Sequence, residues 1–300
     1  MSPLIPLKVL MIGNSFSICV LQYTPEVARQ CGAGVDICSL YIGGCSLARH
    51  CENIRRAGEE GFAPYEVNWN FASLGEGEEP ALKSAVTVRE TDKGSKMYGN
   101  IPQMLAAEKW DIVTIQQASP KSWDPGSYHP YADELISTIR ELAPQAKIAI
   151  QETWSYCNGD KRICDQAAGG PGEWGFDQRG MFDRLAANYA DLGAKYGFDI
   201  IPTGTAIQLF RERLPVSGID DDVVGSMKPV NGELSGDSIH LNNDGKYLQA
   251  CVWAAKLLGA DVESMDWAPS PTMRHPENAA LIRKCAADAV RGVKPARRAD

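Results

Sequence analysis

Lys8-Val9-Leu10-Met11-Ile12-Gly13-Asn14-Ser15 is the stretch of this 300-residue sequence that decides the fold. Its four consecutive apolar residues, 9–12, are typical of a strand buried on both faces of a parallel sheet. Gly13 closes the strand, and Ser15 follows at its carboxyl end. Ligands of such sheets bind beyond the carboxyl ends of the strands, so Ser15 is a candidate functional residue. From these residues alone, a turn with a capping serine is the simpler interpretation.

Strands and helices alternate along the rest of the chain. Further buried strands are expected at 35–40, 111–116, 147–151 and 198–201. Helices are expected at 24–32, 47–56, 101–108, 131–142, 182–196 and 242–258, the first with Thr24 as its N-cap and Pro25 at its first position. This alternation predicts an α/β fold with a mostly parallel, doubly wound sheet and helices on both faces.

Two segments depart from this pattern. Residues 67–71 and 85–89 alternate with period two and predict an antiparallel hairpin, inserted at about residues 66–90. We expect one domain over residues 1–268, followed by a C-terminal tail over 269–300 that carries a surface helix at about 276–293.

Composition narrows the classes of function. The formal net charge of −8 would repel phosphate backbones and anionic membrane surfaces, so we expect no nucleic-acid or membrane partner. No run of about 18 apolar residues predicts a transmembrane helix. The first residues lack the features of a signal peptide, which favours a cytoplasmic protein; a chain from which a secretion signal had been removed would read the same way. The oligomeric state has no signature in the sequence.

The nine cysteines are odd in number and scattered, which favours thiols in a reducing compartment over a disulfide framework. Cys45, His50 and Cys51 lie close together in sequence, but no Cys-x-x-Cys pair accompanies them. We therefore expect no metal site.

Asp237-Ser238-Ile239-His240 is the second candidate functional stretch. A serine nucleophile needs a base, which is usually histidine, and a carboxylate on the other ring nitrogen orients that base. A separation of three residues on a tight turn can bring Asp237 and His240 together. Their alternative role is structural, with Asp237 capping the start of the helix at 242–258. The other histidines are less suitably placed: a surface position is expected for one on an arginine-rich helix, and the others lie before a proline and in a proline-rich tail (His50, His129 and His275).

Two further motifs follow predicted strands. Gly43-Gly44 could aim backbone N–H groups at a developing oxyanion, and Gln116-Gln117 could add a side-chain amide. A plain glycine turn and a polar strand end are the alternative interpretations.

Together and in this order, these stretches resemble the SGNH (GDSL-type) hydrolase superfamily over roughly residues 8–258. The resemblance implies a flavodoxin-like sheet of about five parallel strands. It also implies that Ser15 is the nucleophile, His240 the base and Asp237 its partner. The oxyanion donors would be the backbone amides of Ser15 and Gly44. No cofactor is implied.

The sequence departs from the family pattern at two positions. Asn14 stands where aspartate is usual, and Gln116-Gln117-Ala118-Ser119 stands where the family's third block supplies an asparagine. Some carbohydrate esterases of the superfamily use glutamine at the comparable place, so Gln116 is expected to complete the oxyanion hole.

The expected substrate is a small-molecule or oligosaccharide ester. Tryptophans 69, 123, 154 and 174 fall near strand ends or in loops and could stack on sugar rings, Trp154 being the best placed. Glu152 could bind sugar hydroxyls. Asn14, Gly43, Gln117 and Trp154 are the expected substrate-binding residues. We therefore expect a serine esterase that removes an acyl group, an acetate in our interpretation, from a carbohydrate. A lipid or thioester acyl hydrolase, or a catalytically weak carbohydrate-binding protein of the same fold, are the alternatives.

Overall fold

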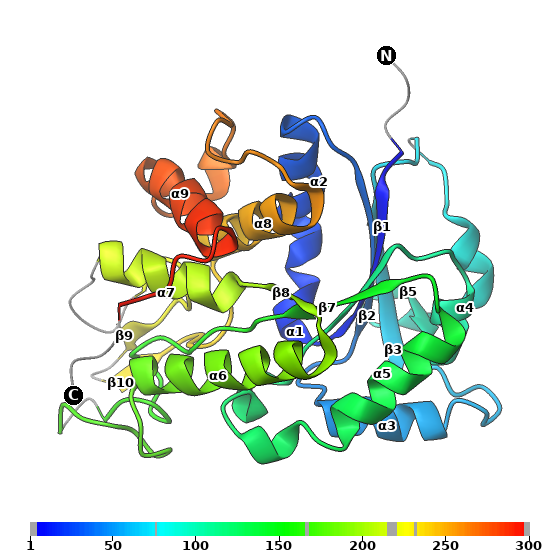
Figure 1. Cartoon of the computed structure of the whole chain (residues 1–300), viewed down its shortest axis with the longest axis horizontal. Helices are drawn as coiled ribbons and strands as arrows, with labels where there is room; N and C mark the ends of the chain where they lie inside the picture. The colour runs from blue at the N-terminus through cyan, green and yellow to red at the C-terminus, as the bar shows by residue number, and fades with distance from the viewer. Residues whose placement is uncertain (1–4, 76, 166–167, 215–220, 231–232, 297–300) are drawn as a thin grey trace.

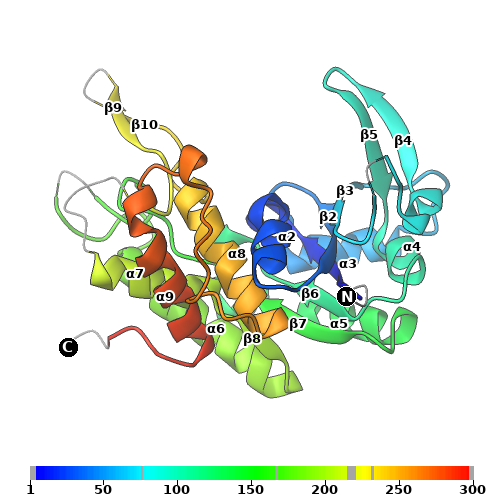
Figure 2. The same ribbon diagram turned by 90° about the horizontal axis from the view of Figure 1, so that it is seen from above.

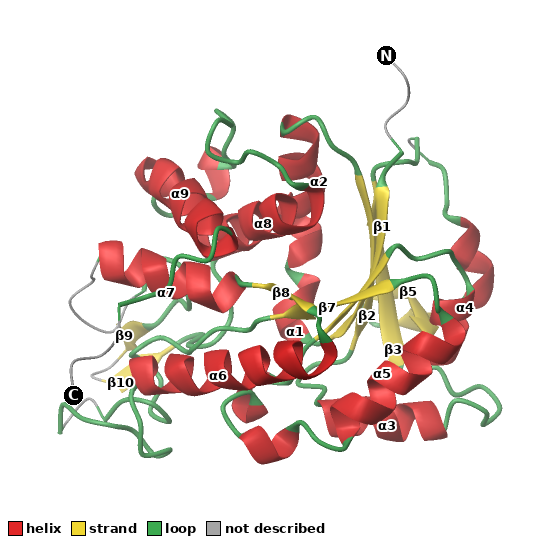
Figure 3. Cartoon of the chain, viewed as in Figure 1, coloured by secondary structure: helices red, strands yellow, loops and turns green. Residues whose placement is uncertain are grey.

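The computed structural model describes residues 5–75, 77–165, 168–214, 221–230 and 233–296. The first four residues, on which the expectation about a signal peptide partly depends, lie outside these ranges. At its centre is an eight-stranded sheet with the strand order β4-β5-β3-β2-β1-β6-β7-β8 (Figures 1 and 3). A separate two-stranded sheet joins β9 (Lys228–Val230) and β10 (Glu233–Ser235).

Five neighbouring strands of the large sheet run parallel. They are β2 (Val35–Tyr41), β1 (Leu7–Gly13), β6 (Ile112–Ile115), β7 (Lys147–Gln151) and β8 (Asp199–Ile201). Counted in chain order among themselves, they stand 2-1-3-4-5, which is the flavodoxin-like order. In the register of β1, Ile12 lies opposite Leu40 and Ile115. The predicted fold class is confirmed, and the end of β1 lies at the point where the strand order reverses.

The other three strands correct the predicted insertion. β3 (Tyr65–Phe71) pairs antiparallel with β2, and β5 (Gly94–Gly99) pairs with both β3 and β4 (Thr87–Thr91). The segment at 85–89 therefore does not form a hairpin with 67–71. Period-two alternation identifies a strand but not its partner, and the two-residue connection between Thr91 and Gly94 favours pairing of β4 with β5. Figure 2 shows this hairpin extending away from the body of the molecule.

Helices cover both faces of the sheet (Figures 1 and 2). Those packed together on one face are α2 (Val20–Gln30), α7 (Thr203–Arg213), α8 (Asn243–Leu258) and α9 (Ala279–Val290). Those packed together on the other face are α3 (Leu47–Arg55), α4 (Ile101–Ala106) and α5 (Tyr131–Leu142). The long helix α6 (Gln178–Tyr196) packs on β8 and α7, and the short helix α1 (Ser15–Ile18) follows β1.

The start of α2 differs from the prediction. The helix begins at Val20, so Pro25 lies inside it and Thr24 is not its N-cap. A proline inside a helix removes the hydrogen bond to the carbonyl four residues earlier, which here belongs to Leu21. The side chain of Asn70 on β3 donates to that carbonyl at 3.3 Å, so the acceptor does not lose its partner.

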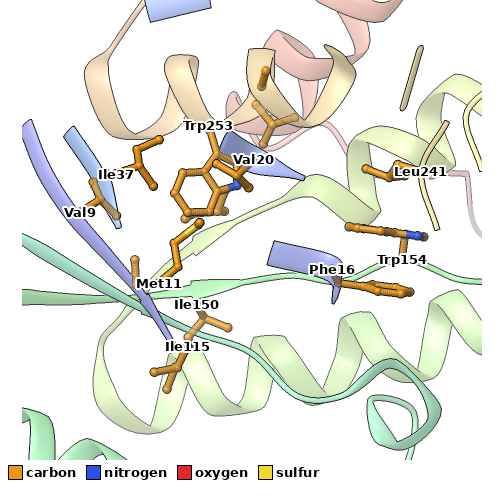
Figure 4. Close-up of a cluster of buried hydrophobic side chains, with 14 of the residues drawn as sticks. Val9, Met11, Phe16, Val20, Ile37, Ile115, Ile150, Trp154, Leu241 and Trp253 are labelled. Atoms are coloured by element: carbon orange, nitrogen blue, oxygen red, sulfur yellow. The ribbon is translucent and has the colours of Figure 1, made fainter. Parts of the chain in front are cut away.

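The core joins α8 and α2 to the parallel strands. Trp253 of α8 is buried beside Val20, Val9 and Met11 (Figure 4), and its indole N–H donates to Gln151 Oε1 at 2.6 Å.

Helix α9 was expected at the surface, but one of its faces is buried, including Ile282 and Cys285. The boundary at residue 268 stays a prediction. Within the described ranges, no helix combines the length and apolar character that crossing a membrane requires.

Candidate active site

The turn after β1 places Ser15 at the carboxyl edge of the sheet. Asn14 is the N-cap of α1, and its side-chain oxygen accepts from the backbone N–H of Phe16 at 3.0 Å. Gly13 leaves room for the Ser17 side chain, because a Cβ there would lie 2.3 Å from Ser17 Oγ and 2.9 Å from Ser17 Cβ. Ser15 is the first residue of the helix and is partly exposed. The sequence therefore builds a tight turn that presents one hydroxyl group to solvent.

Asn14 joins three segments around this turn. Its Nδ2 donates to the carbonyl of Cys45 at 3.0 Å, and its Oδ1 accepts from Gln116 Nε2 at 2.8 Å. An ionised aspartate could make the second bond but could not donate to Cys45, which explains an asparagine here. Asn14 is buried and holds the turn, the glycine loop and β6 together, and its contact with substrate stays a prediction.

The glycine loop lies beside this turn, through the bond from Asn14 to Cys45. Gly43 and Gly44 are exposed, and Gly44 has a φ of +63°, which favours glycine. The N–H of Cys45 donates to the Ile42 carbonyl at 3.2 Å and closes the loop. Within the described ranges, the N–H groups of Ser15 and Gly44 donate to no acceptor. Both are suitable oxyanion donors, and that role stays a prediction, as does a substrate contact for Gly43.

The two glutamines after β6 have structural partners. Gln117 is 0% exposed, accepts from the N–H of Leu47 and Ala118, and donates to the carbonyl and hydroxyl of Ser127. Its amide is thus buried and bonded on both sides, and contact with substrate stays a prediction. Gln116 is also buried, and its amide N–H points at Asn14. This geometry favours support of the Asn14 turn over direct contact with an oxyanion.

Asp237 and His240 form the pair that their spacing predicts. His240 Nδ1 lies 2.7 Å from Asp237 Oδ2, and both side chains are 40% exposed. Asp237 Oδ1 accepts from the backbone N–H groups of Ile239 and His240, at 2.9 Å each. Partial burial would raise the pKa of Asp237, but these two N–H groups and the imidazole lower it below its ordinary range. The carboxylate therefore stays charged beside Nδ1 and leaves Nε2 as the basic nitrogen.

Trp154 joins the Ser15 helix to the His240 loop. Its ring stacks on Phe16 with centroids 4.1 Å apart and planes 8° from parallel (Figure 4). Its indole N–H donates to the carbonyl of Ile239 at 2.9 Å, and Phe16 also meets the His240 ring edge-on at 5.7 Å. Trp154 is 0% exposed, and its contact with substrate stays a prediction. It positions the neighbours of both candidate catalytic residues.

Ser15 and His240 line the same cavity. The cavity has a volume of about 560 Å³, within the usual range for small-molecule sites. Its wall consists of residues from α1, α2, β3, α8 and the loop before α8: Ser15, Ile18, Cys19, Leu21, Gln22, Asn68, Asp237, His240, Leu241 and Lys246. In the part of the chain that the structure describes, Ser15 Oγ has no hydrogen-bond partner. Catalytic hydrogen bonds often tighten only when substrate binds, so this open arrangement suits a nucleophile and its base.

Comparison with known protein families assigns this chain to one of them. A family profile described as a domain of unknown function, DUF4886, matches residues 87–289, about two thirds of the sequence. The chain belongs to the DUF4886 family. The matched region contains Asp237 and His240, and Ser15 precedes it. No protein with a curated description matches the chain.

Comparison with solved structures supports this family assignment. A DUF4886 family protein from Bacteroides uniformis ATCC 8492 is 28% identical, with a TM-score of 0.70, and the match covers 97% of this chain and 98% of that one. A protein from Slackia heliotrinireducens, described as a candidate SGNH hydrolase, is 20% identical with a TM-score of 0.50 over 84% of this chain and 100% of its own. This DUF4886 chain therefore has the fold of the SGNH hydrolases.

The other three histidines of this DUF4886 chain have different environments. His50 was expected at the surface but is buried, and its Nδ1 lies 2.8 Å from Tyr65 Oη. Burial lowers the pKa of His50 to about 3, so its ring is neutral. His129 and His275 are paired with carboxylates away from Ser15. Among the described residues, no cluster of His, Cys, Asp or Glu could hold a metal ion, and the nine cysteines form no disulfide there.

Replacing Trp154 by phenylalanine should keep the stacking on Phe16 and remove the hydrogen bond to the carbonyl of Ile239. We expect the free energy of unfolding to fall by about 1–3 kcal/mol, because a partly buried acceptor loses its partner. We also expect kcat for a hydrolysed ester to fall more than KM changes, because the His240 loop loses an anchor. Thermal unfolding and steady-state kinetics measure the two effects.

Trp110→Phe is the matched control for this variant. Trp110 is equally buried and donates its indole N–H to the carbonyl of Met104 at 2.8 Å, with no contact to the cavity. It should lose similar stability and keep its kcat. A Trp154→Phe enzyme with the wild-type kcat would contradict the positioning role.

Glu152, expected to bind sugar hydroxyls, is instead buried at the end of β7. Its carboxylate accepts from the Thr205 N–H at 2.8 Å and the Thr205 hydroxyl at 3.1 Å, near the start of α7. Burial raises the pKa of Glu152 to about 7, although the bonds from Thr205 oppose this shift. The carboxyl therefore titrates near neutrality without exposure to the substrate cavity.

Glu152→Gln should change how stability depends on pH. The folded chain keeps the Glu152 proton up to about pH 7, whereas the unfolded chain loses it near pH 4.5. The stabilisation from this raised pKa is fully present below about pH 4.5 and is lost as the pH rises through 7. Relative to wild type, the variant should thus gain about 3 kcal/mol of unfolding free energy between pH 4.5 and pH 8. Denaturant unfolding across this range measures it, with Glu141→Gln at an exposed position as control; parallel profiles for all three proteins would refute the shift.

Proposed function

We propose that this chain is a serine esterase that removes a short acyl group, an acetate, from a carbohydrate. One observation carries the proposal: Ser15 and His240 line one cavity, and the Nδ1 of His240 lies 2.7 Å from a carboxylate oxygen of Asp237. A serine, a base and an orienting carboxylate are the groups that acyl transfer needs. The SGNH fold, shared with a candidate hydrolase, supports a hydrolytic reaction.

The reaction takes two steps. Ser15 Oγ attacks the ester carbonyl while His240 Nε2 takes the hydroxyl proton, and the Asp237 carboxylate stabilises the imidazolium. The backbone N–H groups of Ser15 and Gly44 stabilise the tetrahedral oxyanion. As the intermediate collapses, His240 gives its proton to the departing sugar oxygen, which leaves an acyl group on Ser15. Water, deprotonated by His240, then releases the acyl group and restores the serine. Neither step requires a metal ion or an organic cofactor.

Two features support a carbohydrate as the alcohol portion. Half-buried Trp123 and Trp174 lie 5.4 Å apart, and Arg162 stacks over the Trp174 ring at 5.3 Å. Arg162 also lines a second depression beside His240, of about 380 Å³. Aromatic rings beside polar groups suit sugar rings. The apolar part of the Ser15 cavity consists of only a few side chains, which suits a short acyl group.

The test is an ester series followed by a saccharide screen. Wild-type protein is incubated with p-nitrophenyl esters of increasing chain length and then with acetylated oligosaccharides, with acetate release as the readout. We expect turnover of the acetate ester and acetate release from a saccharide. A preference for chains of eight or more carbons would favour a lipid or thioester hydrolase. Saccharide binding without any turnover would favour a carbohydrate-binding protein of the same fold.

A further inference from the structure

Lys246 places a cation in the wall of the cavity that contains Ser15 and His240. It lies in the first turn of α8, three positions after the start of the helix, and is half-buried. Within the described ranges, its ammonium group has no hydrogen-bond acceptor and no carboxylate within 4 Å. Lys256, which lines another cavity, differs in this respect, because it pairs with Asp199 at 2.6 Å.

The other ionisable groups of this cavity do not neutralise Lys246. The Asp237 carboxylate is bonded to the His240 ring and to two backbone N–H groups. Burial raises the pKa of Cys19 to about 12, so that residue is a neutral thiol, and it donates to Gln249. On α8 itself, the Asp244 carboxylate accepts from the backbone N–H groups of Arg274 and His275.

Removing an ammonium group from water without a partner costs free energy. An anionic oxygen at hydrogen-bond distance offsets that cost. A ligand that fills this cavity would displace water from Lys246. Neutral amides at Gln22 and Asn68 line the same wall and could bind the hydroxyl or carbonyl groups of that ligand. The chain carries a net charge of −8, so long-range electrostatics would oppose an anionic ligand, and a local cation is needed to bind one.

We propose that the substrate carries a carboxylate that binds Lys246 while Ser15 attacks the ester. The proposal rests on the proposed esterase function and defines its substrate class as an ester of a carboxylate-bearing compound. The carboxylate could belong to the alcohol portion, as in an acylated sugar acid, or to the acyl portion, as in a dicarboxylic half-ester. The chemistry at Lys246 is the same in both cases.

Two matched ester pairs separate these sources. The first compares 4-acetoxybenzoate with its neutral methyl ester, and the second compares mono-4-nitrophenyl succinate with 4-nitrophenyl butyrate. For one of these pairs, Lys246→Gln should lower the ratio of kcat/KM for the anionic ester to kcat/KM for the neutral ester. The expected decrease is about tenfold, the usual effect of one charge-assisted hydrogen bond. Lys246→Glu should lower the ratio further. The pair that responds identifies the portion that carries the carboxylate.

Lys256→Gln is the matched control. It removes the same charge from the same helix, about 15 Å further along, and its ammonium group does not line this cavity. Its ratios should stay within twofold of wild type. If Lys246→Gln changes neither ratio more than Lys256→Gln does, the proposal is overturned.

A binding measurement keeps this test independent of turnover. The affinities of 4-hydroxybenzoate and monomethyl succinate are compared with those of their neutral methyl esters by titration calorimetry, in the wild-type and Lys246→Gln chains. If one carboxylate binds the wild-type chain more tightly than its methyl ester does, and Lys246→Gln abolishes this difference, the site is supported. This holds even if no ester is hydrolysed and the esterase proposal fails. Equal affinities for acid and ester in the wild-type chain overturn the proposal, even if esters are hydrolysed.

Discussion

Replacement of Ser15 by alanine is expected to lower kcat/KM for an acetate ester by about 10⁴-fold or more, as in triad variants of other hydrolases. Alanine keeps the backbone N–H and the Asn14 cap but removes the atom that attacks the carbonyl. The thermal midpoint should change little, because the serine hydroxyl has no partner among the described residues. Hydrolysis of p-nitrophenyl acetate, followed by absorbance, measures the rate.

Ser17→Ala is the matched control for this experiment. Ser17 belongs to the same Gly-Asn-Ser-Phe-Ser stretch, but its hydroxyl is buried and donates to the carbonyl of Asn14 at 2.9 Å. It should retain activity within about tenfold of wild type, with some loss of stability. If Ser15→Ala keeps the wild-type rate while Ser17→Ala does not, the assignment of the nucleophile is wrong.

Asp237→Asn should lower kcat by about 10³–10⁴-fold with little change in KM. An asparagine can keep its oxygen toward the backbone N–H groups of Ile239 and His240, so the turn should persist. Its amide N–H would then face His240 Nδ1, which stabilises the tautomer whose Nε2 carries a proton and cannot accept one. Kinetics with the acetate ester and the thermal midpoint, compared with wild type, separate this effect from unfolding. A folded Asp237→Asn enzyme with more than a tenth of the wild-type kcat would contradict the role of Asp237.

The parallel half of the fold could be predicted from sequence because its signals are local. Runs such as residues 9–12 and 148–150 are apolar throughout, and only a strand between two helical layers buries such a run on both faces. Asp237 and His240 were found for the same reason, since a separation of three residues on one turn fixes their contact.

Features that depend on distant partners were missed. The indole of Trp154 follows a strand end, as a substrate-stacking ring would, but the backbone of residue 239 and the ring of Phe16 enclose it. Gln116 and Gln117 are adjacent polar residues, and only the positions of Asn14 and Ser127 show that both amides are used internally. Helix α7 was not predicted, although Ala206, Ile207 and Phe210 have helical spacing and are buried.

Covalent labelling of the wild-type chain with a fluorophosphonate, followed by peptide mass spectrometry, tests most directly whether Ser15 is a nucleophile activated by His240. Such reagents react with serines that a neighbouring base deprotonates, so the measurement does not depend on knowing the natural substrate. We predict a single adduct on Ser15, its absence from the Ser15→Ala chain, and much slower labelling of a His240→Ala chain. An adduct on another residue, or labelling that both substitutions leave unchanged, would contradict the account.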